Sequence, residues 1–176
     1  RAFKAPTFNE LFFPFFGDPS IRPERSRNYE VGYNLNMGQT SLQLSAFHNK
    51  VEDLIAFDST TFLANNINQA RIRGAELSAT STWANYVFNL SVSRVKAIDE
   101  SGGANHGNEL ARRARYFGNI DIDRSFGSYS IGASLQSVSR RYDDGGNATR
   151  LGSYGLVDLR GSMSLNSNWS VDARLS

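Results

Sequence analysis

The sequence predicts an all-β protein whose antiparallel strands form part of a transmembrane β-barrel. The first observation is alternation: from Val157 to Leu165, apolar residues occupy every second position and charged or hydroxylated residues lie between them. Successive side chains of a strand point to opposite faces, so such a strand has one apolar and one polar face. The second observation is that short turns, such as Gly127-Ser128, alternate with long polar loops, such as 99–108. That asymmetry is typical of outer-membrane barrels, whereas a soluble β-sandwich would share only the alternation.

Composition excludes several other classes of protein. The longest apolar run, Leu11 to Phe16 with Pro14 inside it, is far shorter than the roughly 18 residues of a membrane-spanning helix. The 19 basic and 17 acidic residues are scattered along the chain, which argues against a basic face for nucleic acid. The chain has no cysteine, so it has neither a disulfide framework nor a thiolate metal site.

Each predicted strand is defined by apolar residues at alternate positions. After a strand end at 1–5, the first-half strands and their apolar residues are 27–36 with Tyr29, Val31, Tyr33 and Leu35, 40–57 with Leu42, Leu44 and Ala46, and 65–83 with Ala75, Leu77, Ala79 and Trp83. In the second half they are 86–98 with Tyr86, Phe88, Leu90 and Val92, 111–126 with Tyr116, Ile120 and Ile122, 129–142 with Tyr129, Ile131, Ala133 and Leu135, then 154–166 and a strand from Trp169.

The connections predict how the barrel wall is oriented in the membrane. We expect the short turns at 37–39, 84–85, 127–128 and 167–168 to face the periplasm, and the loops 6–26, 58–64, 99–110 and 143–153 to face outside. Residues expected to face lipid are Ala75, Leu77, Ile120, Ile122, Ile131, Leu135, Leu159 and Met163. Residues expected to face the lumen are Glu76, Asp121, Asp123, Asp158 and Arg160. A slip between the faces is expected near Phe47, where the apolar residue changes parity.

Aromatic residues gather beside the short turns, at Trp83, Tyr86, Phe126, Tyr129 and Trp169. Side chains with an apolar body and a polar tip favour the membrane–water interface. We therefore interpret them as an interfacial girdle, and ordinary core aromatics at strand ends are the alternative.

The carboxylates of the polar face are interpreted as a solvated lumen wall rather than as an acid–base pair. Charges are costly against lipid and inexpensive in a hydrated lumen. The chain also has no Gly-x-Ser-x-Gly elbow and no phosphate-binding glycine motif. The sequence therefore predicts no enzyme and no cofactor.

Two loops contain the candidate site residues. The loop 6–26 places Phe12, Phe13, Phe15 and Phe16 on a connection that should be exposed. Such a cluster either forms a contact surface for a ligand or folds over its own side chains.

The other candidate loop contains the segment 143–147, which has two aspartates, two glycines and an asparagine. Calcium loops are built from such residues. This segment lacks the spacing and terminal Glu of an EF-hand, so the alternatives are a calcium site and a plain flexible loop. With His48 and His106 isolated, no metal site is assigned.

Ordered motifs resemble the barrel of TonB-dependent outer-membrane receptors along the whole chain. They are Phe3-Lys4-Ala5-Pro6, the run Gly17 to Ser26, Asn28-Tyr29-Glu30-Val31-Gly32, the run Phe47 to Ile55 and the run Asn68 to Glu76. Asp18 departs from the family, which more often has Asn there. Within the family, the runs Leu110 to Arg115 and Arg141 to Asp144 resemble the cobalamin (vitamin B12) receptors, although Ala111 stands where those usually have Pro.

The resemblance implies a function and a domain context. Residues 1–176 would be about 8–9 strands of a 22-stranded barrel with a plugged lumen, with the plug domain and the last strands outside this chain. The implied function is TonB-dependent uptake of cobalamin or another scarce chelate through the bacterial outer membrane, with the TonB complex acting through the plug. Ligand-facing loop candidates are Phe12, Phe13, Phe15, Phe16, Arg141, Tyr142, Asp143 and Asp144. A siderophore–iron receptor is the alternative within the family, and a passive porin is the alternative outside it.

Overall fold

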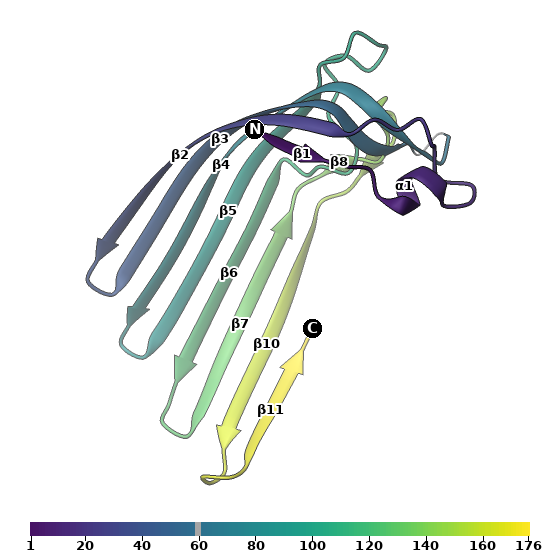
Figure 1. Cartoon of the computed structure of the whole chain (residues 1–176). Coiled ribbons are helices and arrows are strands. Elements are labelled where there is room, and N and C mark those ends of the chain that lie inside the picture. The colour runs from purple at the N-terminus through teal and green to yellow at the C-terminus, as the bar shows by residue number, and fades with distance from the viewer. Residues whose placement is uncertain (59–60) are drawn as a thin grey trace.

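A computed structural model describes residues 1–58 and 61–176. One antiparallel sheet of nine strands dominates it, in the order β1-β2-β3-β4-β5-β6-β7-β10-β11. The sheet is a curved wall with short hairpins at one end and α1 with the longer loops at the other (Figure 1). The strands are β1 Ala2–Lys4, β2 Glu24–Met37, β3 Thr40–Asp58, β4 Leu63–Trp83, β5 Tyr86–Asp99, β6 Tyr116–Ser125, β7 Tyr129–Val138, β10 Tyr154–Ser164 and β11 Ser170–Leu175. The predicted all-β antiparallel wall is confirmed, with strand bounds close to the predicted ones from 27 to 98.

Two predicted strands are shorter than the alternation indicated. β6 begins at Tyr116 and not at 111, and β7 ends at Val138 and not at 142. Arg112 has a φ of 59°, which turns the chain away from the sheet before β6 can extend. Its backbone N–H donates instead to the carbonyl of Tyr142. Residues beyond β7 form a separate hairpin, in which β8 (Arg141–Tyr142) pairs with β9 (Arg150–Leu151).

The predicted loop 6–26 contains a short helix that was not predicted, α1 (Phe8–Phe12). Thr7 and Glu10 form a capping box: Thr7 Oγ1 accepts from the Glu10 N–H at 3.3 Å, and the Thr7 N–H donates to Glu10 Oε2 at 2.6 Å. Those bonds satisfy helix donors that would otherwise lack partners. Lys4 lies 3.3 Å from both Glu10 and Glu24, which ties the helix to β1 and β2. The predicted loop 58–64 falls partly on residues 59 and 60, outside the described residues.

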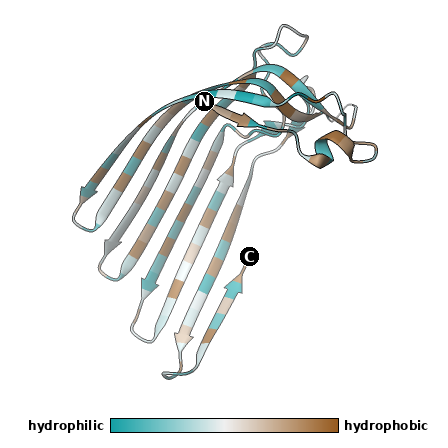
Figure 2. Cartoon of the chain, viewed as in Figure 1, coloured by the Kyte–Doolittle hydropathy of each residue, from teal (hydrophilic) through white to brown (hydrophobic). Residues whose placement is uncertain are grey.

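The register of the sheet places apolar residues opposite apolar residues on one face. One continuous row across seven strands consists of Leu35, Leu42, Ala79, Leu90, Ile120, Leu135 and Val157. The neighbouring row on the other face is entirely polar and consists of Asn36, Ser41, Thr80, Asn89, Asp121, Ser134 and Asp158. Directly opposed residues of antiparallel strands share a face, and Figure 2 shows the resulting alternation along the strands. The predicted division of the wall into an apolar and a polar face is therefore confirmed.

The expected slip near Phe47 was wrong. Phe47 pairs in register with Glu30 and Gly74, and the ladder continues without interruption through it. The polar face tolerates this aromatic residue because Gly74 has no side chain: a Cβ there would lie 2.7 Å from Phe47 Cζ. The break in the β3–β4 ladder comes instead at Asp53, whose φ is 56°.

Ion pairs connect strands on the polar face. The Arg160 guanidinium donates from Nε to Asp123 Oδ1 at 2.7 Å and lies 3.6 Å from an Asp121 oxygen. Arg174 reaches Asp158 at 3.2 Å. Three carboxylates that were predicted to face the lumen, those of Asp121, Asp123 and Asp158, thus each have an arginine partner on a nearby strand. This arrangement supports strand register.

Aromatic residues beside the short turns contact one another. The Phe126 and Tyr129 rings stack at 4.8 Å, and the Arg124 guanidinium lies over Tyr86 at 4.7 Å and over Phe126 at 4.4 Å. Trp83 and Trp169 are each 70% exposed. These rings are therefore surface residues at the hairpin end and not a packed core.

Buried apolar residues gather at the loop end of the sheet. The cluster contains Val51, Leu54, Ala70, Ala97 and Leu110. Below it, the described strands form a single layer whose large apolar side chains, such as Leu135 and Leu159, are about half exposed. Among the described residues, no helix is long and apolar enough to cross a membrane.

Candidate ligand cavity at the loop end

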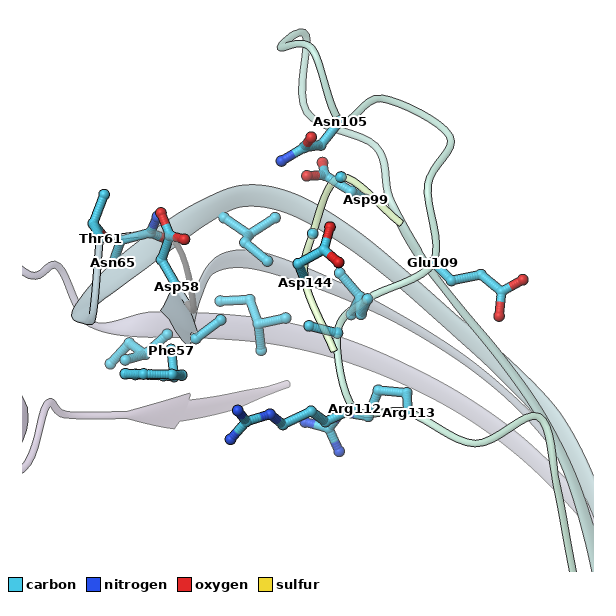
Figure 3. Close-up of a pocket in the computed structure, with 18 residues that line it drawn as sticks. Phe57, Asp58, Thr61, Asn65, Asp99, Asn105, Glu109, Arg112, Arg113 and Asp144 are labelled. Carbon is cyan, nitrogen blue, oxygen red and sulfur yellow. The ribbon is translucent and has the colours of Figure 1, made fainter. Parts of the chain in front are cut away.

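A cavity of about 590 Å³ opens where three segments meet above the buried cluster. They are the β3–β4 hairpin end, the loop after β5 and the β8–β9 hairpin, and Figure 3 shows their side chains around one space. Leu54, Ile67 and Leu110 supply apolar lining that is shared with the buried cluster. The polar lining residues are Asp58, Thr61, Asn65, Asp99, Asn105, Glu109, Arg112, Arg113 and Asp144.

The loop after β5 is held against the end of that strand. The Asp99 N–H donates to the Asn108 carbonyl at 2.9 Å, and the Gly107 N–H donates back to the Asp99 carbonyl at 2.8 Å. The buried Asp99 carboxylate accepts from the Ser101 N–H at 2.7 Å. Leu110 returns to the sheet, because its N–H donates to the Ala97 carbonyl at 3.0 Å. This folding back carries Asn105 and Arg112 to the cavity.

Asn147 connects that loop to the β8–β9 hairpin. Its Oδ1 accepts from the Glu109 N–H at 2.8 Å, and its Nδ2 donates to the Glu109 carbonyl at 2.8 Å. The residue has a φ of 59°, a conformation that Asn tolerates better than most residues. Asn108 Nδ2 adds a bond to the Gly145 carbonyl at 3.0 Å. One amide side chain thus pairs with the backbone of the neighbouring loop as a strand would.

The two aspartates of the hairpin are engaged by hydrogen-bond donors. Asp144 accepts from the Thr149 N–H at 2.6 Å and from the Ala148 N–H at 3.1 Å, and these bonds hold the pKa of its carboxyl below the usual range. Asp143 pairs with the Arg112 guanidinium at 2.7 Å. In the described ranges, no group of three or more His, Asp or Glu side chains is arranged to hold a metal ion.

The structure places the predicted site residues in different surroundings. Asp144 lines the cavity, and Asp143 contacts it through Arg112. The Arg141 guanidinium lies over the Tyr154 ring at 5.6 Å, beside the cavity rather than in it. Tyr142 fixes the position of Arg112, because its carbonyl accepts from the Arg112 N–H at 2.6 Å.

The predicted phenylalanine cluster divides into two parts. Phe16 stacks on Phe57 with ring centroids 5.9 Å apart, and Phe57 lines the cavity beneath the Arg112 guanidinium at 5.3 Å. Phe12, Phe13 and Phe15 are 56%, 53% and 98% exposed. They contact solvent at the loop end and do not line the cavity.

Several lining residues were not singled out by the sequence. Asn105 and Thr61 lie in polar connections and Asn65 lies at the start of β4, with no motif around any of them, so composition gives no signal for them. Arg112 and Arg113 belong to the run from Leu110 to Arg115, whose resemblance to the cobalamin receptors gave no prediction of a role for either residue. Their position depends on the turn at Arg112, which alternation does not predict.

We expect Asn147→Ala to loosen the loop that it holds. The substitution leaves the Glu109 N–H and carbonyl without their partners, which costs roughly 1–2 kcal/mol locally. Amide exchange at Glu109 and Leu110 should then accelerate about 5–30-fold, measured by hydrogen–deuterium exchange on the intact protein. Asn168→Ala, at the opposite end of the sheet, is the control and should leave that exchange unchanged. Equal protection in Asn147→Ala and the wild type would contradict this account of the loop.

The fold and the cavity together define a class of protein: a transmembrane barrel wall with a polar cavity among its long loops. The whole chain, residues 1–176, matches the family described as TonB dependent receptor-like, beta-barrel. The chain belongs to this family, and the outer-membrane location that the sequence predicts follows from that membership.

Two curated relatives are similar over nearly the whole chain. The vitamin B12 transporter BtuB of Photobacterium profundum is 27% identical over 181 residues, which cover 99% of this chain and 29% of the relative. The vitamin B12 transporter BtuB of Vibrio vulnificus is 28% identical over 177 residues, which cover 98% of this chain and 28% of the relative. The chain therefore spans less than a third of the length of these relatives.

Solved structures share the fold at lower identity. The copper transporter OprC superposes with a TM-score of 0.78 at 20% identity, over 98% of this chain and 29% of that one. The ferric yersiniabactin uptake receptor FyuA of Yersinia pestis superposes with a TM-score of 0.74 at 20% identity, over 85% and 24%. These likenesses establish the barrel architecture and leave the ligand to be argued from the site.

Proposed function

We propose that this chain forms part of the wall and outer loops of a receptor for TonB-dependent uptake of cobalamin. The observation that carries the proposal is the similarity, along nearly the whole of this chain, to two transporters named for vitamin B12. In such a receptor the barrel would surround a plug domain on which the TonB complex acts. The ligand would bind at the loop end and pass inward without covalent chemistry.

The charge of the cavity supports this ligand class. Its lining includes the carboxylates of Asp58, Asp99 and Asp144 together with the guanidiniums of Arg112 and Arg113. Glu109 also contributes to the lining, but its carboxylate points away in Figure 3 and pairs with Arg115. The cavity therefore has no cationic excess with which to attract a polyanionic chelate.

The amide groups of the cavity suit a bulky ligand with many neutral polar groups. Asn65 and Asn105 each offer a donor and an acceptor. Corrin side chains are carboxamides, so each can donate a hydrogen bond to such an amide group and accept one from it. The apolar lining from Leu54, Ile67 and Leu110 would contact the ring system. Because the cavity joins three loops, a large ligand could be held from several sides.

Binding to the full-length protein that contains this chain tests the proposal. We expect cyanocobalamin to bind in detergent at least about tenfold more tightly than a ferric siderophore, measured by titration calorimetry. Asn65→Ala combined with Asn105→Ala should weaken cyanocobalamin binding about tenfold, since each lost hydrogen bond costs about 0.5–1.5 kcal/mol. Asn166→Ala combined with Asn168→Ala, at the hairpin end, should leave the affinity unchanged.

Two outcomes would overturn the assignment. Binding of a ferric siderophore without binding of cyanocobalamin would establish the siderophore alternative, which the iron-uptake structures with this fold make the natural second candidate. Passive diffusion of small solutes through the intact protein, with no specific ligand, would establish a porin.

A further inference from the structure

The apolar face of the sheet becomes cationic toward the loop end. Successive rows on this face run across β2, β3, β4 and β5. The first two rows are mostly apolar and consist of Tyr33, Leu44, Leu77 and Val92, and of Val31, Ala46, Ala75 and Arg94. The next two rows are rich in basic residues and consist of Tyr29, His48, Arg73 and Lys96, and of Arg27, Lys50, Arg71 and Ile98. The last two rows are called here the cationic rows. Five of their side chains are arginine or lysine, on four neighbouring strands.

Like charges in the cationic rows lie directly opposite one another. Lys50 pairs in register with both Arg27 and Arg71, and Arg73 pairs with Lys96. Such pairs destabilise an isolated sheet. Among the residues that the structure describes, Arg71 alone of these cations has an acidic partner, Glu100 at 2.8 Å. In the described part of the chain, no carboxylate forms an ion pair with Arg27, Lys50, Arg73 or Lys96.

The side chains of the cationic rows are available to a partner. Arg27, Lys50, Arg73 and Lys96 are exposed. Arg71 is half-buried, and its guanidinium is paired with Glu100. Repulsion between these opposed and exposed cations indicates that an anion belongs on this surface.

The distance of the cationic rows from the hairpin end of the sheet indicates the source of that anion. Arg73 lies ten residues from Trp83 along β4, and Lys96 lies ten residues from Tyr86 along β5. Ten residues span roughly 34 Å along a strand. At a tilt of about 35–45° this is roughly 24–28 Å across the membrane, which matches the apolar band of about 25 Å in such barrels. The cationic rows therefore lie at the membrane boundary on the side of the long loops.

We propose that the cationic rows bind the phosphate-bearing headgroup of an anionic lipid whose acyl chains cover the apolar rows below. Guanidinium groups match phosphate oxygens in geometry and charge. The Arg94 guanidinium over the Tyr116 ring, at 5.7 Å, and the exposed Tyr29 add the amphipathic side chains that favour this depth. The inference depends on the barrel and its register and is independent of the transported ligand.

Native mass spectrometry of the intact protein in a non-ionic detergent tests this surface with two lipid probes. We expect phosphatidylglycerol to bind about tenfold more tightly than zwitterionic phosphatidylcholine, and less so at high salt. Lys50→Gln combined with Arg73→Gln should reduce the preference to about twofold or less. Arg140→Gln combined with Arg150→Gln removes two exposed cations at the loop end that lie outside the rows, and it should retain the full preference.

Three results would overturn the proposal. The first is equal binding of the two lipids by the wild type. The second is an equal loss of preference in both double variants, which would indicate a net-charge effect. The third is complete displacement of phosphatidylglycerol by about 10 mM inorganic phosphate, which would indicate a free-anion site with no role for the acyl chains. The salt dependence of wild-type binding requires no variant, so it keeps the test decisive even if a substitution impairs folding.

Discussion

Leu135→Arg is expected to destabilise the membrane-inserted barrel by about 2–4 kcal/mol, the cost of a cation on the lipid face near the bilayer midplane. Leu135 lies in the continuous apolar row and is 45% exposed on a single-layer sheet. It is six residues from Tyr129 along β7, which places it roughly 14–17 Å above the aromatic hairpin end at the usual rise and tilt. The measurement is the free energy of unfolding of the intact barrel from lipid vesicles in denaturant.

Gln136→Arg is the matched control for that substitution. Gln136 is the next residue of the same strand, so it has the same depth, and it faces the polar side opposite Asn119. A cation there should remain hydrated in the lumen and change the stability by about 0.5 kcal/mol or less. Equal costs at the two positions would show that the apolar face does not contact lipid. A larger cost at Gln136 would show that the two faces are reversed.

Gly74→Ala is expected to cost about 1–3 kcal/mol, a large effect for one added methyl group. A Cβ at this position would lie 2.5 Å from the Arg94 carbonyl oxygen and 2.7 Å from Phe47 Cζ. The backbone oxygen cannot move without disturbing the β4–β5 ladder, and the ring cannot move without leaving its place on the polar face. Denaturant unfolding of the same intact barrel provides the measurement.

Gly118→Ala is the control for the glycine substitution. Gly118 also lies within a strand, but a Cβ there would meet no atom within 4 Å. Its replacement should change stability by about 0.5 kcal/mol or less, or stabilise the strand slightly, since Ala loses less conformational freedom than Gly on folding. If Gly74→Ala and Gly118→Ala cost the same, the loss comes from the strand backbone and not from the contact with Phe47.

Local sequence signals predicted the sheet well where two neighbouring strands pair along their whole length. From 27 to 98 the strand bounds agree with the predicted ones to within a few residues. The reason is that the alternating apolar residues from Tyr29 to Leu35 pair with those from Leu42 to Ala46 on the next strand. The short turns at Gly38, Ala84-Asn85 and Gly127 all have residues with positive φ, as tight hairpins require. These features depend on nearby residues, so the sequence expresses them directly.

The candidate site was much less predictable than the sheet. Asp144 was anticipated as a loop residue, but its pairing with the backbone of Ala148 and Thr149 was not. The bridge from Asn147 to Glu109 joins residues 38 positions apart, and the stacking of Phe16 on Phe57 joins the loop after α1 to the end of β3. Contacts of this range depend on how the sheet curves at its loop end, and no local pattern records that curvature.

By itself, the sequence determined the fold class, the order of the strands and the two faces of the wall, because a strand exposes its residues with a fixed period of two. The family also followed from ordered motifs that lie along the whole chain. Only the tertiary structure decided that β6 begins at Tyr116, that α1 forms within a loop, and that three loops enclose one cavity. It also decided that the cations of β2 to β5 lie opposite one another in the register of the sheet. The physical reason is that these features depend on register, on backbone turns such as the one at Arg112, and on side chains brought together from distant strands.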